Sequence, residues 1–333
     1  MDKRNYIQKL PFDINLKERI YITTQCQDCN HIKKVNNAGK VFENATGYSY
    51  QLMHNGIKVI TDGYHGRGIT EIIKLCNGHH EPQEEKAFSQ IFEYLGSNSL
   101  MIELGAHWSY YSLWFQKKIK NAKNIMIEPD ENNLNIGKKN FEINNAHGEF
   151  IQAYISDISI NKNLFERESD NKILEIPCYS VDDFIRINKI KYIDLLHVDI
   201  QGWEIKMLNG LIKTINNNKL RFLFLSTHHH TISHDPLTHQ KCLNFIRANG
   251  GKILCEHSVY ESFSGDGLIV ASFSKEDKSL DNIEISYNRS SNNMFKEIEY
   301  DYYDLLNKYN DAILKKQKST ISKIKNLIKK LIN

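Results

Sequence analysis

The segment "LLHVDIQGWEIKMLNG", residues 195–210, decides the fold class. Its apolar start, 195–198, runs into the charged Asp199, and Gly202 and Glu204 follow before apolar residues recur with helical spacing. This pattern predicts a buried strand, a turn and a helix. The carboxylate at the strand end is either a capping residue or part of a ligand-binding edge, and the rest of the chain distinguishes these two interpretations.

From residue 99 onward, apolar strands alternate with amphipathic helices. Strands are predicted at 99–104, 124–129, 149–156, 191–199, 220–226, 252–257 and 267–273, and helices at 110–120, 131–145, through Met207 and Leu211, and at 237–251. Such alternation is typical of a mostly parallel sheet with helices on both faces. We therefore expect an α/β fold in which ligands bind beyond the carboxyl ends of the strands.

The preceding residues, 1–98, are predicted to form a small α+β cap that contacts the substrate. Residues 1–40 are polar and read as irregular, whereas two alternating runs joined at Asn55-Gly56 predict a hairpin. Helices are expected at 68–76 and 81–96. The sheet domain is then 99–275, and 276–333 is a helical tail.

The end of the tail, residues 311–333, has the pattern of a basic amphipathic helix. Ile321, Ile324, Ile328 and Leu331 fall on one helical face, and lysines crowd the remainder. This pattern suits peripheral contact with an anionic membrane surface, and equally suits packing on a partner chain or on this one.

Composition narrows the class of protein. The chain has 333 residues, of which 41% are hydrophobic and 25% charged, as in soluble globular proteins. Its net charge of +3 gives no indication of nucleic-acid binding. No apolar run approaches the ~18 residues of a membrane span, and the first residues do not resemble a signal peptide. We expect a cytoplasmic protein; a homo-oligomer remains open.

Six cysteines in a chain of this length do not indicate a disulfide scaffold. Cys26 and Cys29 form "CQDC", and Cys76 and His79 form "CNGH". Together the two pairs have ligand types and local spacing that suit a zinc site. The alternative is a set of free loop thiols.

Two predicted strand ends suit a nucleoside ligand. Gly105, in "ELGA", permits a turn that brings backbone close to a ligand, although the G-x-G-x-x-G fingerprint is absent. Glu128, in "IEPD", follows the next strand, where an acid can accept hydrogen bonds from both ribose hydroxyls. The alternative is a solvated carboxylate.

Two further strand ends carry candidate catalytic residues. Asp199 ends one strand, and His228 and His229 follow the next strand along the chain. If these strands are neighbours, the three side chains converge. An imidazole could then act as a base oriented by the acid, or the three residues could hold a divalent metal. The alternative is a structural hydrogen-bond network.

The chain resembles the FkbM family of S-adenosylmethionine-dependent methyltransferases over roughly residues 99–273. The resemblance rests on "MIELGAHWSYYSLWF", on "IEPD" and, most specifically, on "YSVDDF…IDLLHVDIQGWEIKMLNG". It departs from the family pattern at Glu103, which replaces Asp, at Ser109, which replaces a glycine, and at the bulky Trp108.

The resemblance implies a Rossmann-like class I methyltransferase that usually transfers methyl to oxygen, often on sugars or polyketide hydroxyls. It also implies cofactor contacts for Glu103, Gly105 and Ala106 near the methionine part, with Glu128 at the ribose and Asp157 at the adenine side. The predicted acceptor is a hydroxyl of a sugar or glycan, contacted by His79, His80 and Glu81. Two alternatives remain: an inactive cofactor- or sugar-binding module, and an NAD-dependent sugar enzyme, which the missing glycine fingerprint disfavours.

Overall fold

The computed structural model describes residues 2–43 and 47–289, together with a few isolated positions nearer the C-terminus. Residues Met1–Met294 form one compact unit, which contains both predicted domain boundaries, near 98 and near 275. The predicted basic helix of the tail lies almost entirely outside the described residues. Within the described part of the chain, no helix has both the length and the apolar character needed to cross a membrane.

A seven-stranded mixed sheet forms the centre of this unit, in the order β12-β13-β11-β10-β4-β5-β6. Strands β4, β5, β6, β10 and β11 are parallel to their neighbours in this group, whereas β13 runs antiparallel to both β11 and β12. The bounds are β4 (Leu100–Leu104), β5 (Lys123–Ile127), β6 (Glu149–Ile151), β10 (Ile193–Val198), β11 (Leu220–Thr227), β12 (Lys252–His257) and β13 (Gly267–Ser272). The expected α/β Rossmann-like class is confirmed.

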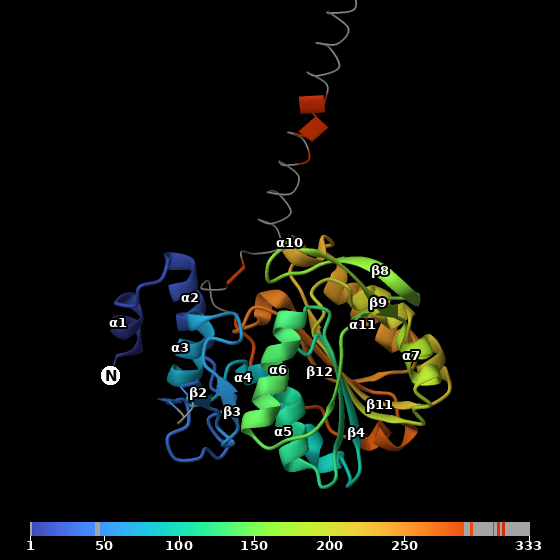
Figure 1. Ribbon diagram of the computed structural model, residues 1–333, viewed down its shortest axis with the longest axis horizontal. Coiled ribbons are helices and arrows are strands. Elements are labelled where there is room, and N and C mark those ends of the chain that lie inside the picture. Colours follow the sequence, from blue (N-terminus) through green and yellow to red (C-terminus); the bar gives the residue numbers. More distant parts are fainter. Residues whose placement is uncertain are drawn as a thin grey trace, which may run out of the picture. The chain divides into compact units, whose positions relative to one another are not determined.

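Alternate residues of the central strands enter two separate hydrophobic cores, because successive side chains of a strand point to opposite faces. Met101 and Leu195 enter one core, and their neighbours Ile102 and Leu196 enter the other. Helices cover both faces (Figure 1). The first core takes side chains from α4 (Pro82–Ile91), α5 (Tyr110–Lys118) and α6 (Glu131–Ile143), and the second from α7 (Val181–Ile187), α8 (Glu204–Asn209), α9 (Ile212–Asn216) and α11 (Thr238–Ala248).

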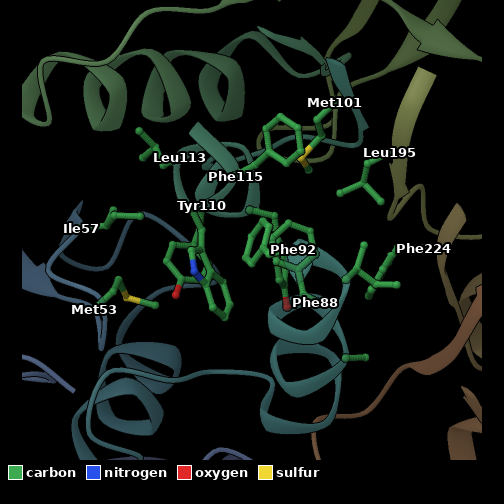
Figure 2. Close-up of a cluster of buried hydrophobic side chains, with 14 of the residues drawn as sticks. Met53, Ile57, Phe88, Phe92, Met101, Tyr110, Leu113, Phe115, Leu195 and Phe224 are labelled. Atoms are coloured by element: carbon green, nitrogen blue, oxygen red, sulfur yellow. The ribbon is translucent and has the colours of Figure 1, made fainter. Parts of the chain in front are cut away.

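The N-terminal region shares the first core with the sheet. Figure 2 shows Met53 and Ile57, from the hairpin region, in the same buried cluster as Met101, Leu195 and Phe224 of the sheet. The hairpin predicted at Asn55-Gly56 lies between β2 (Ser49–Leu52) and β3 (Lys58–Ile60), and β1 (Val41–Glu43) pairs with β2 in a small antiparallel sheet. Helix α3 (Arg67–Leu75) follows. This shared core fixes the N-terminal region against the sheet.

The expectation that residues 1–40 are irregular is wrong, because α1 (Lys3–Gln8) and α2 (Ile14–Thr23) lie there. Asp2 and Asp13 cap these helices, and Asp13 accepts a hydrogen bond from Leu16 N at 2.8 Å. Both helices are short, and α2 buries Ile20 in the first core, which also takes side chains from distant parts of the chain. Short helices depend on tertiary packing, which a local pattern does not reveal.

The strand predicted at 149–156 is divided between two sheets. Its first part is β6, and its second part is β7 (Tyr154–Ile155), which pairs with β9 (Ile173–Tyr179). Strand β8 (Ile160–Glu166) completes this smaller sheet as the antiparallel partner of β9. The hairpin formed by β8 and β9 was not predicted, because β8 has three consecutive polar residues and is largely exposed, so it lacks the alternation typical of a half-buried strand.

Candidate active site

A cavity of about 240 Å³ lies where the parallel strands β4, β5 and β10 end. Gly105, Glu128 and Asp199 line it, one from the segment after each strand. Residues 153–155 and Phe165 of β8 also line it, so the smaller sheet contributes part of its wall. The cavity therefore occupies the edge at which α/β sheets bind ligands.

The turn after β4 depends on glycine at position 105. Gly105 has a φ of +73°, and a Cβ atom on it would lie 1.7 Å from the carbonyl oxygen of Asp199. Ser109, which replaces a glycine of the family pattern, retains the left-handed conformation with a φ of 57°. That conformation costs a non-glycine residue about 1–2 kcal/mol. Ser109 therefore adopts the left-handed backbone conformation that a glycine would adopt more easily at this position.

Glu128 connects the two turns that face the cavity. Its Oε2 accepts a hydrogen bond from His107 N at 3.0 Å, and its Oε1 accepts one from Asp130 N at 2.9 Å. Burial raises the pKa of Glu128 to about 8, although both backbone N–H groups favour the carboxylate. Each oxygen keeps a further lone pair, so a ribose diol can be held here.

The other predicted cofactor residues lie outside the lining of this cavity. Glu103 is buried and accepts a hydrogen bond from Ser112 N at 3.3 Å, and Ala106 is buried beside it in the turn. Asp157 is exposed, and its carboxylate accepts a hydrogen bond from Ser156 Oγ. Their cofactor roles stay predictions.

Asp199 and His228 meet because β10 and β11 are neighbours, with Val198 opposite Leu225. His228 Nε2 lies 3.0 Å from Asp199 Oδ1, and His228 Nδ1 lies 2.6 Å from Glu204 Oε1. Asp266 Oδ1 is 3.7 Å from the same Nε2 atom. Three carboxylates therefore surround one buried imidazole.

This surrounding charge determines the protonation of His228. Burial disfavours the imidazolium, but Asp266, Asp199 and Glu204 outweigh burial and raise the pKa of His228 well above its ordinary value. Burial and His228 act in opposite directions on Asp199, and the pKa of Asp199 is lowered. Both ring nitrogens of His228 face carboxylates, Nε2 at 3.0 Å from Asp199 and Nδ1 at 2.6 Å from Glu204. The arrangement favours a carboxylate, rather than this imidazole, as the proton acceptor.

Glu204, in the segment 195–210, joins the turn after β10 to the imidazole of His228. Its Oε1 accepts a hydrogen bond from Gly202 N at 2.8 Å and also faces His228 Nδ1. Gly202 has a φ of +97°, and a Cβ atom there would lie 2.9 Å from Ser233 Cα. The completely buried Glu204 therefore joins the turn after β10 to His228, beyond any effect on the start of α8.

Asp266 is a candidate residue that the sequence did not indicate. It immediately precedes β13, and burial raises its pKa. Because β13 is antiparallel to β11, its start lies at the edge where the parallel strands end. Inspection of strand ends alone overlooks such a residue, and the direction of β13 is the signal that could have identified it.

His229 and the predicted acceptor residues are placed differently from Asp199 and His228. His229 precedes α10 (His230–Ser233), and its Nδ1 lies 3.0 Å from Thr231 Oγ1. The side chains of His79 and His80 are each 1% exposed, so neither imidazole is open to a sugar acceptor in this structure. Glu81 is 13% exposed and accepts a hydrogen bond from Tyr111 Oη at 3.0 Å. Their catalytic and acceptor roles stay predictions.

A Rossmann-like sheet with a glycine turn and an acid at its nucleoside edge defines the general class of nucleotide-cofactor enzymes. Within that class, residues 90–253 match the family described as "Methyltransferase FkbM domain". This segment is an FkbM-family methyltransferase domain, and the protein is an S-adenosylmethionine-dependent methyltransferase. A search of curated proteins found no match.

Several solved methyltransferase structures are similar in fold. M. capricolum TrmK in complex with S-adenosyl-homocysteine has 12% identity and a TM-score of 0.36, covering 57% of this chain and 68% of that chain. The METTL16 methyltransferase domain (crystal form 2) has 14% identity and a TM-score of 0.41, with 82% and 96% covered. Magnesium protoporphyrin IX methyltransferase from Synechocystis PCC 6803 has 10% identity and a TM-score of 0.38, with 57% and 78% covered. The family assignment rests on the domain match and not on these structures.

Proposed function

We propose that this methyltransferase transfers the methyl group to a hydroxyl oxygen of a sugar or glycan-type acceptor. The observation that carries the proposal is Asp199, an ionised carboxylate on the cavity wall against the Gly105 turn. An alcohol becomes a competent nucleophile only when a base accepts its proton. The 27% exposed side chain of Asp199 is available to do so at the place where the cofactor would lie.

The residues around the cavity fit S-adenosylmethionine, which supplies an activated methyl group when bound. Gly105 lines the cavity where the methionine part would lie, and its lack of a Cβ atom lets the turn pack directly against the carbonyl oxygen of Asp199. Glu128 would accept hydrogen bonds from the ribose hydroxyls. His228 would keep Asp199 ionised and oriented, and Glu204 would hold His228 in place through its other nitrogen.

The polar groups near Asp199 support an acceptor rich in hydroxyl groups. Asp266 is 28% exposed and faces the same imidazole, so a second carboxylate can accept a hydrogen bond from the acceptor. Trp203, 38% exposed, lines the cavity and offers an aromatic surface beside these acids. Together with the family resemblance, this combination favours a sugar over an apolar acceptor.

The test supplies purified protein with S-adenosylmethionine carrying an isotope-labelled methyl group and a panel of sugars, nucleotide-linked sugars and glycans. We expect label on an oxygen atom of one sugar class, located by mass spectrometry and NMR. Asp199→Asn should abolish transfer, and Glu142→Gln, which changes an exposed carboxylate of α6 outside the cavity lining, should retain it. Label found on nitrogen would contradict the proposal, as would cofactor binding without transfer to any acceptor. Preferential binding of NAD in a parallel titration would favour the dehydrogenase-type alternative.

A further inference from the structure

The N-terminal region contains a second polar cavity, of about 80 Å³, that shares no lining residue with the candidate active site. Cys26, Cys29, Cys76 and His79 all line it. The first two follow α2 and the last two follow α3, so the pairs are separated in sequence and adjacent in the fold. The spacings C-x-x-C and C-x-x-H supply the ligand types of structural zinc sites.

The turn that carries Cys76 and His79 is tight. Asn77 and Gly78 both have positive φ, of 52° and 93°. A Cβ atom on Gly78 would lie 2.2 Å from His54 N, so the turn is pressed against the neighbouring backbone. This conformation lets the residues on either side of it line one cavity.

His79 has the environment of a metal-binding histidine. Its Nδ1 lies 2.5 Å from Glu85 Oε2, while its buried Nε2 has no hydrogen-bond partner among the described residues. A carboxylate behind the ring fixes the tautomer whose other nitrogen carries the lone pair, as is usual for histidine ligands of metals. A buried nitrogen without a partner requires an explanation, and a metal ion supplies one.

Cys29 is a free thiol close to this histidine, and Cys26 and Cys76 are free thiols that line the same cavity. Ligand atoms of Cys29, His79 and Glu85 all lie within 4.8 Å of one another. Cys29 Sγ donates to the carbonyl oxygen of Pro82 at 3.2 Å, and Cys26 Sγ lies 3.6 Å from Ser286 Oγ. Thiols are weak hydrogen-bond donors and acceptors, so these contacts hold the two sulfurs only loosely.

We propose that Cys26, Cys29, Cys76 and His79 bind one structural zinc ion, with Glu85 behind His79 as its hydrogen-bond partner. Three thiolates, one imidazole and Zn²⁺ carry a net charge of −1, which Lys3 and Lys34 on the same cavity wall offset. The ion would fasten the ends of α2 and α3 to the start of α4. It would have no part in methyl transfer, because its ligands lie outside the lining of the active-site cavity.

The experiment measures zinc per chain in full-length protein expressed with added zinc and purified under reducing conditions without chelator. We expect about one zinc per chain in the wild type, as for a closed four-ligand site. Cys29→Ser and Cys76→Ser should lose it. Cys242→Ser, which changes a completely buried thiol of α11 outside this cavity, should keep it.

A second measurement on the wild type guards against variants that do not fold. Replacement of zinc by Co²⁺ should produce the visible absorption of a tetrahedral site together with thiolate-to-cobalt charge-transfer bands. Folded wild-type protein that contains almost no zinc would overturn the proposal. An octahedral cobalt spectrum without thiolate bands would also overturn it, as would a disulfide between Cys26 and Cys29 in the zinc-supplied protein.

Discussion

Two buried clusters of this protein are inverse in composition. In the first, the imidazole of His228 is surrounded by three carboxylates, those of Asp199, Glu204 and Asp266. In the second, the carboxylate of Glu85 lies among three imidazoles: His79 Nδ1 is 2.5 Å away, His80 Nδ1 is 2.8 Å away and His54 Nδ1 is 3.6 Å away. In each cluster the partners outweigh burial and favour the charged form of the central group, raising the pKa of His228 and lowering that of Glu85.

The clusters differ in the exposure of their outer members. Asp199 and Asp266 are 27% and 28% exposed, and Asp199 lines the active-site cavity. The three imidazoles around Glu85 are at most 2% exposed. Similar ionic groups can therefore serve different purposes: the His228 cluster can reach a substrate, whereas the Glu85 cluster can act only on the fold or on an ion buried with it.

The largest expected effect is on turnover in the His228 cluster. Asp199→Asn removes the proposed proton acceptor, and loss of such a group typically lowers the rate by about 10²–10⁴. Cofactor affinity should change little, because Glu128 and the Gly105 turn are retained. Single-turnover kinetics at saturating acceptor, paired with calorimetry of cofactor binding, measure both. Near-normal turnover in the variant would remove Asp199 from the mechanism.

The opposite outcome is expected in the Glu85 cluster, where stability and not turnover should change. Glu85→Ala leaves buried imidazoles without their carboxylate, and breaking a buried pair in this way costs about 3–5 kcal/mol of unfolding free energy. Glu18→Ala is the matched control, because it breaks the exposed Arg4–Glu18 pair and should cost less than about 1 kcal/mol. Denaturant unfolding measures both variants. Equal losses in the two would show that burial does not distinguish these pairs.

Glu128 is a buried carboxylate whose hydrogen-bond partners are backbone N–H groups rather than imidazoles. It therefore tests whether a carboxylate at the cavity edge needs an imidazole partner to bind a ligand. Glu128→Ala should weaken S-adenosylmethionine binding by about 1.5–3 kcal/mol, the range for hydrogen bonds to charged groups. Because burial raises the pKa of Glu128 to about 8, the carboxylate form increases above that pH, and wild-type affinity should rise with pH. Isothermal calorimetry gives both results, with Glu142→Ala as the control outside the cavity. Unchanged affinity in folded Glu128→Ala would place the ribose elsewhere.

The smallest expected effect is the pH dependence of turnover around the ordinary histidine pKa, about 6.5. The raised pKa of His228 keeps its imidazolium as pH rises through this value, and the lowered pKa of Asp199 keeps its carboxylate as pH falls. With cofactor and acceptor saturating, the rate should change less than about two-fold between pH 6 and 7. A neutral histidine base would instead lose activity on acidification. A steep decline that persists in Asp266→Asn would restore the imidazole as the base.

Much of the fold and part of the site followed from local pattern. Alternating strands and helices predicted the α/β class, and Gly105, Glu128 and Asp199 were placed at strand ends because each follows an apolar run. Parallel strands end at one edge, so these residues meet there without further information. The helices of the first 40 residues were missed, because their stability comes from packing against distant segments.

The sequence by itself determined the fold class and predicted a ligand site where the parallel strands end, whereas the meeting of Asp199 with His228 depended on β10 and β11 being neighbours. Only the tertiary structure decided that Glu204 and Asp266 surround His228 and help to raise its pKa, and that His79 and His80 are closed to a sugar acceptor. The physical reason is that protonation and access depend on burial and on charges brought from distant parts of the chain. Glu85, for example, lies close to His54, which is 31 residues away in the sequence. His228 lies close to Asp266 because β13, which follows Asp266, runs antiparallel to β11. Local spacing determines which residues of a strand or helix share a face. The electrostatic environment of each residue depends instead on the residues that the fold places around it.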